Sequence, residues 1–156
     1  MQRRFARLVV PVAGSGMDER VLGMLPDLLR NEGGTITFLF VVEVPQSMPL
    51  DAELPTDIDI GERALRHAEN AARQALPSRN TNIVTELLQA RAVGPAIVDE
   101  AIERDADAIV MTAAVHRRHG RPTLGETTVH VLLNAPCEVL VIRTVPDPLP
   151  AARIQR

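Results

Sequence analysis

The sequence contains no tryptophan and no tyrosine, and it contains only 3 phenylalanines. Proteins that bind single-stranded nucleic acid stack the bases on exposed aromatic rings, so this shortage argues against such platforms. The net charge of −3 gives no electrostatic reason to expect a nucleic-acid partner either. We therefore predict no nucleic-acid partner. The positive charge comes from arginine, whose forked guanidinium can bind an anion through two hydrogen bonds.

Cysteine is scarce as well, because Cys137 is the only one. A single cysteine excludes an internal disulfide framework and suits the reducing cytoplasm, which is the location we predict. Glu138 beside it opposes a reactive, low-pKa thiol, so we expect a buried and inert side chain. No run approaches the roughly 20 apolar residues of a membrane span. The basic start MQRRF is soon followed by the polar GSGMDER, so we predict neither a membrane span nor a secretory signal.

The length of 156 residues suits one domain with a proper core. Apolar residues make up 46% of the chain and charged residues 24%, which is ordinary globular composition. We predict one α/β domain over residues 1–145, followed by a Pro-rich C-terminal tail over 146–156.

Continuously apolar segments and segments of helical spacing alternate along the chain. The apolar segments predict strands at 7–14, 35–44, 81–90, 106–114 and 137–144. The amphipathic segments predict a helix between GSGMDER and NEGG, in which Pro26 indicates a kink or a broken turn, and helices at 62–76, 94–105 and 123–134. The segment 45–61, rich in proline and acidic residues, is interpreted as a long surface loop.

This alternation predicts a five-stranded parallel sheet with helices on both faces, a Rossmann-like three-layer α/β sandwich. In such sheets the ligand crevice lies beyond the carboxyl ends of the strands, where the strand order reverses. The segments to inspect are therefore VAGSG, EVPQS and TAAVHRRHG. The GSG at 14–16 is only a fragment of a dinucleotide-binding loop and is a weak signal.

The second half of the chain carries the most specific pattern, GPAIVDEAIERDADAIVMT followed by LG…V…VLLNAPCEVLVIR. With these segments the chain resembles the universal stress protein family, from RLVVPV to EVLVIR. The resemblance implies a five-stranded parallel sheet of the adenine-nucleotide alpha-hydrolase-like kind. It also implies a homodimer built along the C-terminal strand, 138–144. In many members it implies an ATP site.

ATP-binding members of that family carry a glycine motif after the fourth strand, in which a final Gly precedes Ser or Thr. Here the final glycine is Gly125, but Glu126 follows it, and the two earlier glycine positions hold Thr112 and Val115. The aspartate that contacts the nucleoside in those members corresponds here to Ala13.

Three further positions match the lining of the family's adenosine pocket. They are Pro11, Val41 and Met111. Apolar residues at such positions are also expected from the fold alone.

The chemistry of the changed motif argues against a bound triphosphate. Glycines let the backbone approach phosphate and turn its N–H groups toward it, whereas β-branched Val115 does not suit such a turn. TLGE is a capping-box pattern, which predicts Thr123 as the N-cap of the fourth helix and Glu126 at its third position. A carboxylate at that helix end would repel a triphosphate.

Two interpretations of the loop HRRHGR (116–121) remain open. His116, Arg117 and Arg118 could bind phosphate oxygens in place of the lost backbone cradle, or the loop could be solvated surface. The hydroxyls of Thr127 and Thr128 could assist or could be plain helix residues.

A metal site is the weaker alternative for this region. It would use His116, His119, Glu126 and His130, of which the last two share a helix face. Three arginines nearby would disfavour a dication, and the spacing matches no zinc signature, so we predict no metal.

Taken together, these features predict a homodimeric regulatory or interaction domain that lacks the standard ATP site and is not an enzyme. No cofactor is expected, although ATP or another adenine nucleotide remains possible. The alternative is a stress-response protein that binds ATP or AMP through the arginine loop 116–121. A third possibility is that the chain is part of a larger protein, with a partner protein and with the tail as a linker.

Overall fold

The structure is a computed structural model that describes residues 5–76 and 80–144. Five strands form the main sheet: β1 (Arg7–Pro11), β2 (Gly34–Glu43), β3 (Thr81–Ala90), β4 (Ala108–Ala113) and β7 (Glu138–Arg143). Four helices lie between them: α1 (Asp18–Leu28), α2 (Pro55–Ala75), α3 (Val93–Glu103) and α4 (Glu126–Asn134). The predicted tail 146–156 and the proline at 77 lie outside the described residues.

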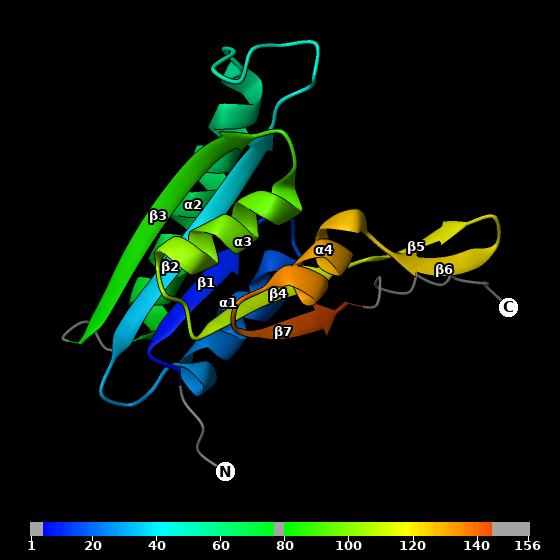
Figure 1. Ribbon diagram of the computed structural model, residues 1–156. Helices are drawn as coiled ribbons and strands as arrows, with labels where there is room; N and C mark the ends of the chain where they lie inside the picture. Colours follow the sequence, from blue (N-terminus) through cyan, green and yellow to red (C-terminus); the bar gives the residue numbers. More distant parts are fainter. Residues whose placement is uncertain (1–4, 77–79, 145–156) are drawn as a thin grey trace, which may run out of the picture.

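The main sheet is parallel throughout, with the strand order β3-β2-β1-β4-β7. Helices α1 and α2 cover one face, whereas α3 and α4 cover the other (Figure 1). This arrangement confirms the predicted three-layer fold. The chain moves outward from β1 to β3 on one side and from β4 to β7 on the other, so the order reverses between β1 and β4.

Alternate residues of the central strand serve two separate cores. Leu8 and Val10 of β1 pack in the cluster beneath α1 and α2, and both are fully buried. Val9 between them packs on the opposite face with Ile97 of α3 and Val131 of α4. A strand that is buried on both faces needs apolar residues at consecutive positions, which explains the continuous apolar runs.

Helix α2 begins earlier than predicted. The surface loop expected over 45–61 ends at Leu54, because residues from Pro55 onward are helical. Proline at the first helical position has no N–H to leave unpaired, and Asp57 lies favourably in the first turn. In α1, Pro26 lies inside the helix, which ends two residues later at Leu28.

The segment between β4 and α4 is a β-hairpin and not a plain loop. Strand β5 (Val115–Arg118) pairs antiparallel with β6 (Arg121–Leu124), and the two-residue turn holds His119 and Gly120 at φ values of 53° and 75°. Two consecutive positive φ angles are typical of the type I′ turn, whose twist suits a hairpin. The hairpin projects beyond the edge of the main sheet (Figure 1).

This hairpin makes the predicted capping box wrong. Thr123 pairs with His116 in the hairpin, so its backbone is extended three residues before α4 begins. Its hydroxyl donates to the carbonyl of Leu124 at 3.2 Å. The N-cap of α4 is Gly125, and no side chain of the described residues caps this helix.

Within 5–76 and 80–144, none of the helices combines the length and the apolar character that crossing a membrane requires.

Candidate functional site

A pocket of about 290 Å³ lies at the carboxyl ends of β1, β2 and β4, where the strand order reverses. Several residues predicted for the site line it together: Pro11, Ala13, Val41, Met111, Thr112 and Thr127. Parallel strands bring their carboxyl ends to one edge of the sheet, which is why residues so distant in the chain meet here.

The lining also includes residues that the sequence analysis did not single out: Val12, Leu39, Phe40, Val93 and Ile97. Val93 and Ile97 lie one turn apart at the start of α3, so both face the pocket. Their apolar i, i+4 spacing directly after a strand was the available signal. Hydroxyls at Thr112 and Thr127 are the polar side-chain groups of the lining. Such a surface suits a flat, largely apolar ring with hydrogen-bonding groups at its rim.

The turn after β1 is closed by the protein's own carboxylate. Asp18, at the start of α1, is only 7% exposed. It accepts hydrogen bonds from the backbone N–H groups of Ala13 at 3.0 Å and of Gly14 at 2.9 Å. Gly14 has a φ of 76°, which favours glycine. These two N–H groups are therefore already used and do not form an open phosphate cradle.

The remaining predicted residues of the arginine segment lie on the hairpin and outside this pocket. Val115, His116, Arg117 and Arg118 are all exposed. Arg118 stands directly opposite Arg121 at the end of the hairpin, so two like charges face each other. A pair of like charges on neighbouring strands is unfavourable unless an anion lies close by.

The helix α4 begins with an acidic residue beside the pocket. Glu126 is its first residue and is exposed, whereas Thr128 is buried at 5% exposure. Gly125 before them lies beneath the imidazole of His116. Glu126 thus lies at the N-terminal end of α4 as predicted, but it is the first helical residue and not the third.

The four residues of the metal alternative do not form a site. His130 instead packs against Gly94 of α3. The side chain of Asn134 donates a hydrogen bond to the backbone carbonyl of His130 at 2.9 Å. Among the described residues, no group of three or more His, Cys, Asp or Glu side chains could hold a metal ion. Cys137 is half-buried, and this burial raises the pKa of its thiol. The thiol is therefore kept in its less reactive form.

Comparison with known proteins agrees with this architecture. Residues 4–143 match the family model described as the universal stress protein family. A universal stress protein from Archaeoglobus fulgidus has 25% sequence identity and a TM-score of 0.67, over 89% of this chain and 94% of that one. A search of curated proteins returned no match.

Two further solved structures contain a nucleotide. The Archaeoglobus fulgidus protein in complex with dAMP has 24% identity and a TM-score of 0.66, over 88% of this chain and 97% of that one. A family protein from Arabidopsis thaliana with AMP bound has 16% identity and a TM-score of 0.63, over 94% and 97% of the two chains. The family model covers most of the sequence, and the folds agree. This chain belongs to the universal stress protein family.

Proposed function

We propose that this chain is a homodimeric regulatory module that does not bind a triphosphate in the manner of the family's ATP-binding members. The observation that supports the proposal most directly is the start of α4. There Glu126 is the first helical residue, and the segment to which the resemblance assigns the glycine-rich phosphate loop forms the β5–β6 hairpin.

The electrostatics of that helix end explain the proposal. The first N–H groups of a helix carry a partial positive charge and attract anions. A carboxylate in the first turn uses this attraction for itself and repels a highly charged polyphosphate. Asp18 likewise uses the N–H groups after β1. In the described chain Glu126 is exposed and makes no capping hydrogen bond, so it opposes a bound phosphate through its charge, whereas Asp18 occupies the N–H groups after β1 directly.

The dimer part of the proposal rests on β7 and α4. Within the described residues β7 has a strand partner on one side only, β4. Its central residues 139–142 are half-buried and apolar. On α4, Leu132 and Leu133 are 47% and 78% exposed. An apolar open edge invites pairing, and in a twofold pair two β7 strands would continue the sheet across both subunits.

Two measurements test these statements. Size-exclusion chromatography with light scattering is expected to give a dimer at micromolar concentration, and a monomer there would refute the dimer. Isothermal titration is expected to show that the protein binds ATP no more tightly than AMP. Tighter binding of ATP than of AMP would refute the claim about the phosphate site.

A second candidate function is binding of an adenine mononucleotide, for which the pocket itself is the specific observation. Its volume and its apolar walls suit a nucleoside, and solved family structures contain dAMP or AMP. In this candidate, Arg117 and Arg118 of the hairpin would meet the single phosphate. Titration with AMP, dAMP and adenosine tests it, and no saturable heat at millimolar ligand would remove it.

A further inference from the structure

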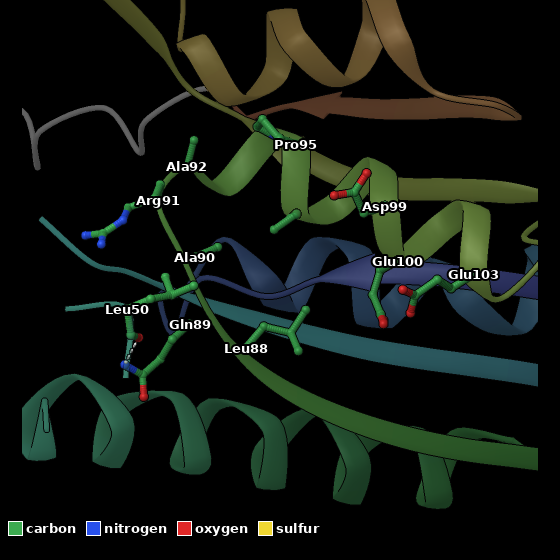
Figure 2. Close-up of a pocket in the computed structure, with 11 residues that line it drawn as sticks. Leu50, Leu88, Gln89, Ala90, Arg91, Ala92, Pro95, Asp99, Glu100 and Glu103 are labelled. Atoms are coloured by element: carbon green, nitrogen blue, oxygen red, sulfur yellow. Dashed lines mark hydrogen bonds between the residues drawn. The ribbon is translucent and has the colours of Figure 1, made fainter. Parts of the chain in front are cut away.

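Two arginines beside a pocket between α3 and β3 are occupied by groups of the protein itself (Figure 2). Arg91 donates to two backbone carbonyls of the segment after β2 at 2.6 and 2.7 Å, and Figure 2 shows its guanidinium directed away from the carboxylates of α3. Arg104 donates to Glu86 at 2.7 Å and lies 3.5 Å from the buried carboxylate of Glu100. These cations of the α/β body therefore have partners within the domain.

The β5–β6 hairpin presents the opposite situation. Three arginines and two histidines lie on its strands and turn: His116, Arg117, Arg118, His119 and Arg121. All five are exposed, and within 5–76 and 80–144 none of them forms an ion pair. The segment 115–125 contains no Asp or Glu, although the net charge of the whole chain is −3. The hairpin thus gathers positive charge without a counter-ion in the described chain.

The hairpin also gains little from packing. It projects from the body, and every residue from 115 to 123 is exposed (Figure 1). A two-stranded hairpin by itself is marginally stable in water, and a third strand or a packed face is needed for stability. The pairing of Arg118 with Arg121 adds a repulsion between like charges. A third strand that carries negative charge would therefore relieve both deficits.

The edge of β5 that faces away from β6 is open to such a strand. In a hairpin with a two-residue turn, the pair that flanks the turn exchanges both hydrogen bonds, and bonded and non-bonded pairs then alternate. The flanking pair here is Arg118 and Arg121. The N–H and C=O groups of Val115 and Arg117 therefore point outward, and no other strand of the described chain pairs with β5. The outer edge of β6 is different, because Pro122 has no N–H to offer there.

We propose that the hairpin binds an extended acidic segment of a partner protein, which adds to the open edge of β5 as a third strand. Backbone hydrogen bonds to Val115 and Arg117 would fix this strand, as in other cases of strand addition. Arg117 and Arg118 are consecutive, so their side chains lie on opposite faces of the hairpin. The matching segment carries two consecutive acidic residues, one for each arginine. This proposal rests on the regulatory and interaction role proposed above and names the class of its partner.

Two other occupants fit the hairpin less well. The hairpin of a second copy would bring its own arginines against Arg117 and Arg118, and like charges would repel. A nucleic acid cannot use the open backbone edge of β5. Its charge would also continue beyond the hairpin toward a chain of net charge −3, and exposed charges interact over about 10 Å at 0.1 M salt. An acidic peptide meets both the charge and the edge.

Fluorescence polarisation of the labelled peptide Thr-Val-Thr-Glu-Glu-Thr-Val-Thr tests the proposal. Saturable binding is expected, and the same peptide with Gln-Gln at its centre is expected to bind about tenfold more weakly. A third peptide carries proline on each side of Glu-Glu. It keeps the charge but lacks two N–H groups, so it is expected to bind more weakly as well. Equal binding of the proline peptide, or tighter binding of an oligothymidylate, would overturn the proposal.

Variants of the protein separate charge from strand addition. Arg117→Gln with Arg118→Gln is expected to weaken peptide binding by about tenfold. Arg20→Gln with Arg66→Gln removes the same charge from exposed positions on α1 and α2, and its affinity is expected to stay unchanged. Equal weakening in both variants would overturn the proposal.

Val115→Pro tests the open edge. It removes an outward N–H group of β5 and leaves the charge and the hydrogen bonds between β5 and β6 intact, so the peptide is expected to bind more weakly. Val115→Thr keeps this N–H group and is expected to bind the peptide as the unchanged protein does. Unchanged affinity in Val115→Pro would overturn strand addition. The peptide is titrated without nucleotide, so its failure to bind is distinguishable from the outcomes of the ATP titration and of light scattering.

Discussion

The imidazole of His116 lies over Gly125, so that a β-carbon at position 125 would be 3.7 Å from the Nε2 atom of His116. That separation is an ordinary van der Waals contact. Gly125 has a φ of −61°, which any residue adopts. Neither space nor backbone conformation therefore requires glycine at the N-cap of α4, in contrast to a phosphate loop in which the backbone must approach its ligand.

A first prediction concerns this uncapped helix. Ser at position 125 could accept a hydrogen bond from an N–H group of the first turn of α4, whereas Ala could not. Gly125→Ser is therefore expected to exceed Gly125→Ala in free energy of unfolding by about 1 kcal/mol. Urea denaturation of the two variants measures the difference. Equal stability would show that α4 gains nothing from a side-chain cap.

A second prediction concerns the carboxylate that closes the turn after β1. Asp18→Ala removes the acceptor for the N–H groups of Ala13 and Gly14 in a buried place. The free energy of unfolding is expected to fall by about 1–3 kcal/mol. Asp27→Ala on the exposed side of α1 is the control, with an expected change within about 0.5 kcal/mol. A loss in Asp18→Ala no larger than in the control would contradict the account of this turn.

A third prediction separates the two candidate functions at the hairpin. If the protein binds AMP, Arg117→Ala with Arg118→Ala is expected to weaken binding by about tenfold, because two charged donors are lost. Glu126→Ser is expected to strengthen binding, since it removes a negative charge from the first turn of α4. Isothermal titration measures both. Unchanged AMP affinity in both variants would place the phosphate away from this end of the sheet.

A fourth prediction concerns the dimer. Leu133→Asp places a charge on the most exposed leucine of α4 and is expected to shift the protein toward monomer in light scattering. Ile102→Asp is the matched control, since Ile102 is 58% exposed on α3. The control is expected to remain dimeric. A dimer of undiminished affinity in Leu133→Asp would exclude this part of α4 from the interface.

A fifth prediction follows from the raised pKa of Glu100. Because burial raises the folded-state pKa of this carboxyl above the ordinary value for glutamate, protonation favours the folded state. This contribution is fully present below the unfolded-state pKa and is lost as the pH rises through the folded-state pKa. Glu100→Gln mimics the protonated form, so its stability relative to the unchanged protein is expected to increase as the pH rises through this range. Urea denaturation at several pH values measures it, and a difference independent of pH would contradict the account.

Much of the architecture was predictable because strands that are buried on both faces of the sheet appear in the sequence as continuously apolar segments. Strand β3 was predicted at the bounds observed, and the other strands of the main sheet differ only at their ends. The meeting of Pro11, Val41 and Met111 at one pocket followed from the family resemblance and from the parallel topology.

The hairpin was not predicted, because its structure depends on pairing within a polar segment that has no apolar periodicity. Its signal was the dipeptide His119–Gly120, both of whose residues adopt positive φ. Histidine visits this region more readily than most residues, but the preference is weak. Once 121–124 pair with 115–118, Thr123 cannot begin a helix, so a valid local pattern was overridden by strand pairing.

The pairing of Val115 with Leu124 brings both ends of the hairpin side by side where it leaves the domain. The hairpin residues between that pair form a separate structural unit. In the described chain, β5 and β6 make a two-stranded sheet that shares no strand pairing with the main sheet. The length and charge of the hairpin can therefore be changed without altering the strand pairing of the main sheet. Replacing the hairpin with a short glycine-rich connection would show what a glycine-rich loop at this position contributes to nucleotide binding by itself.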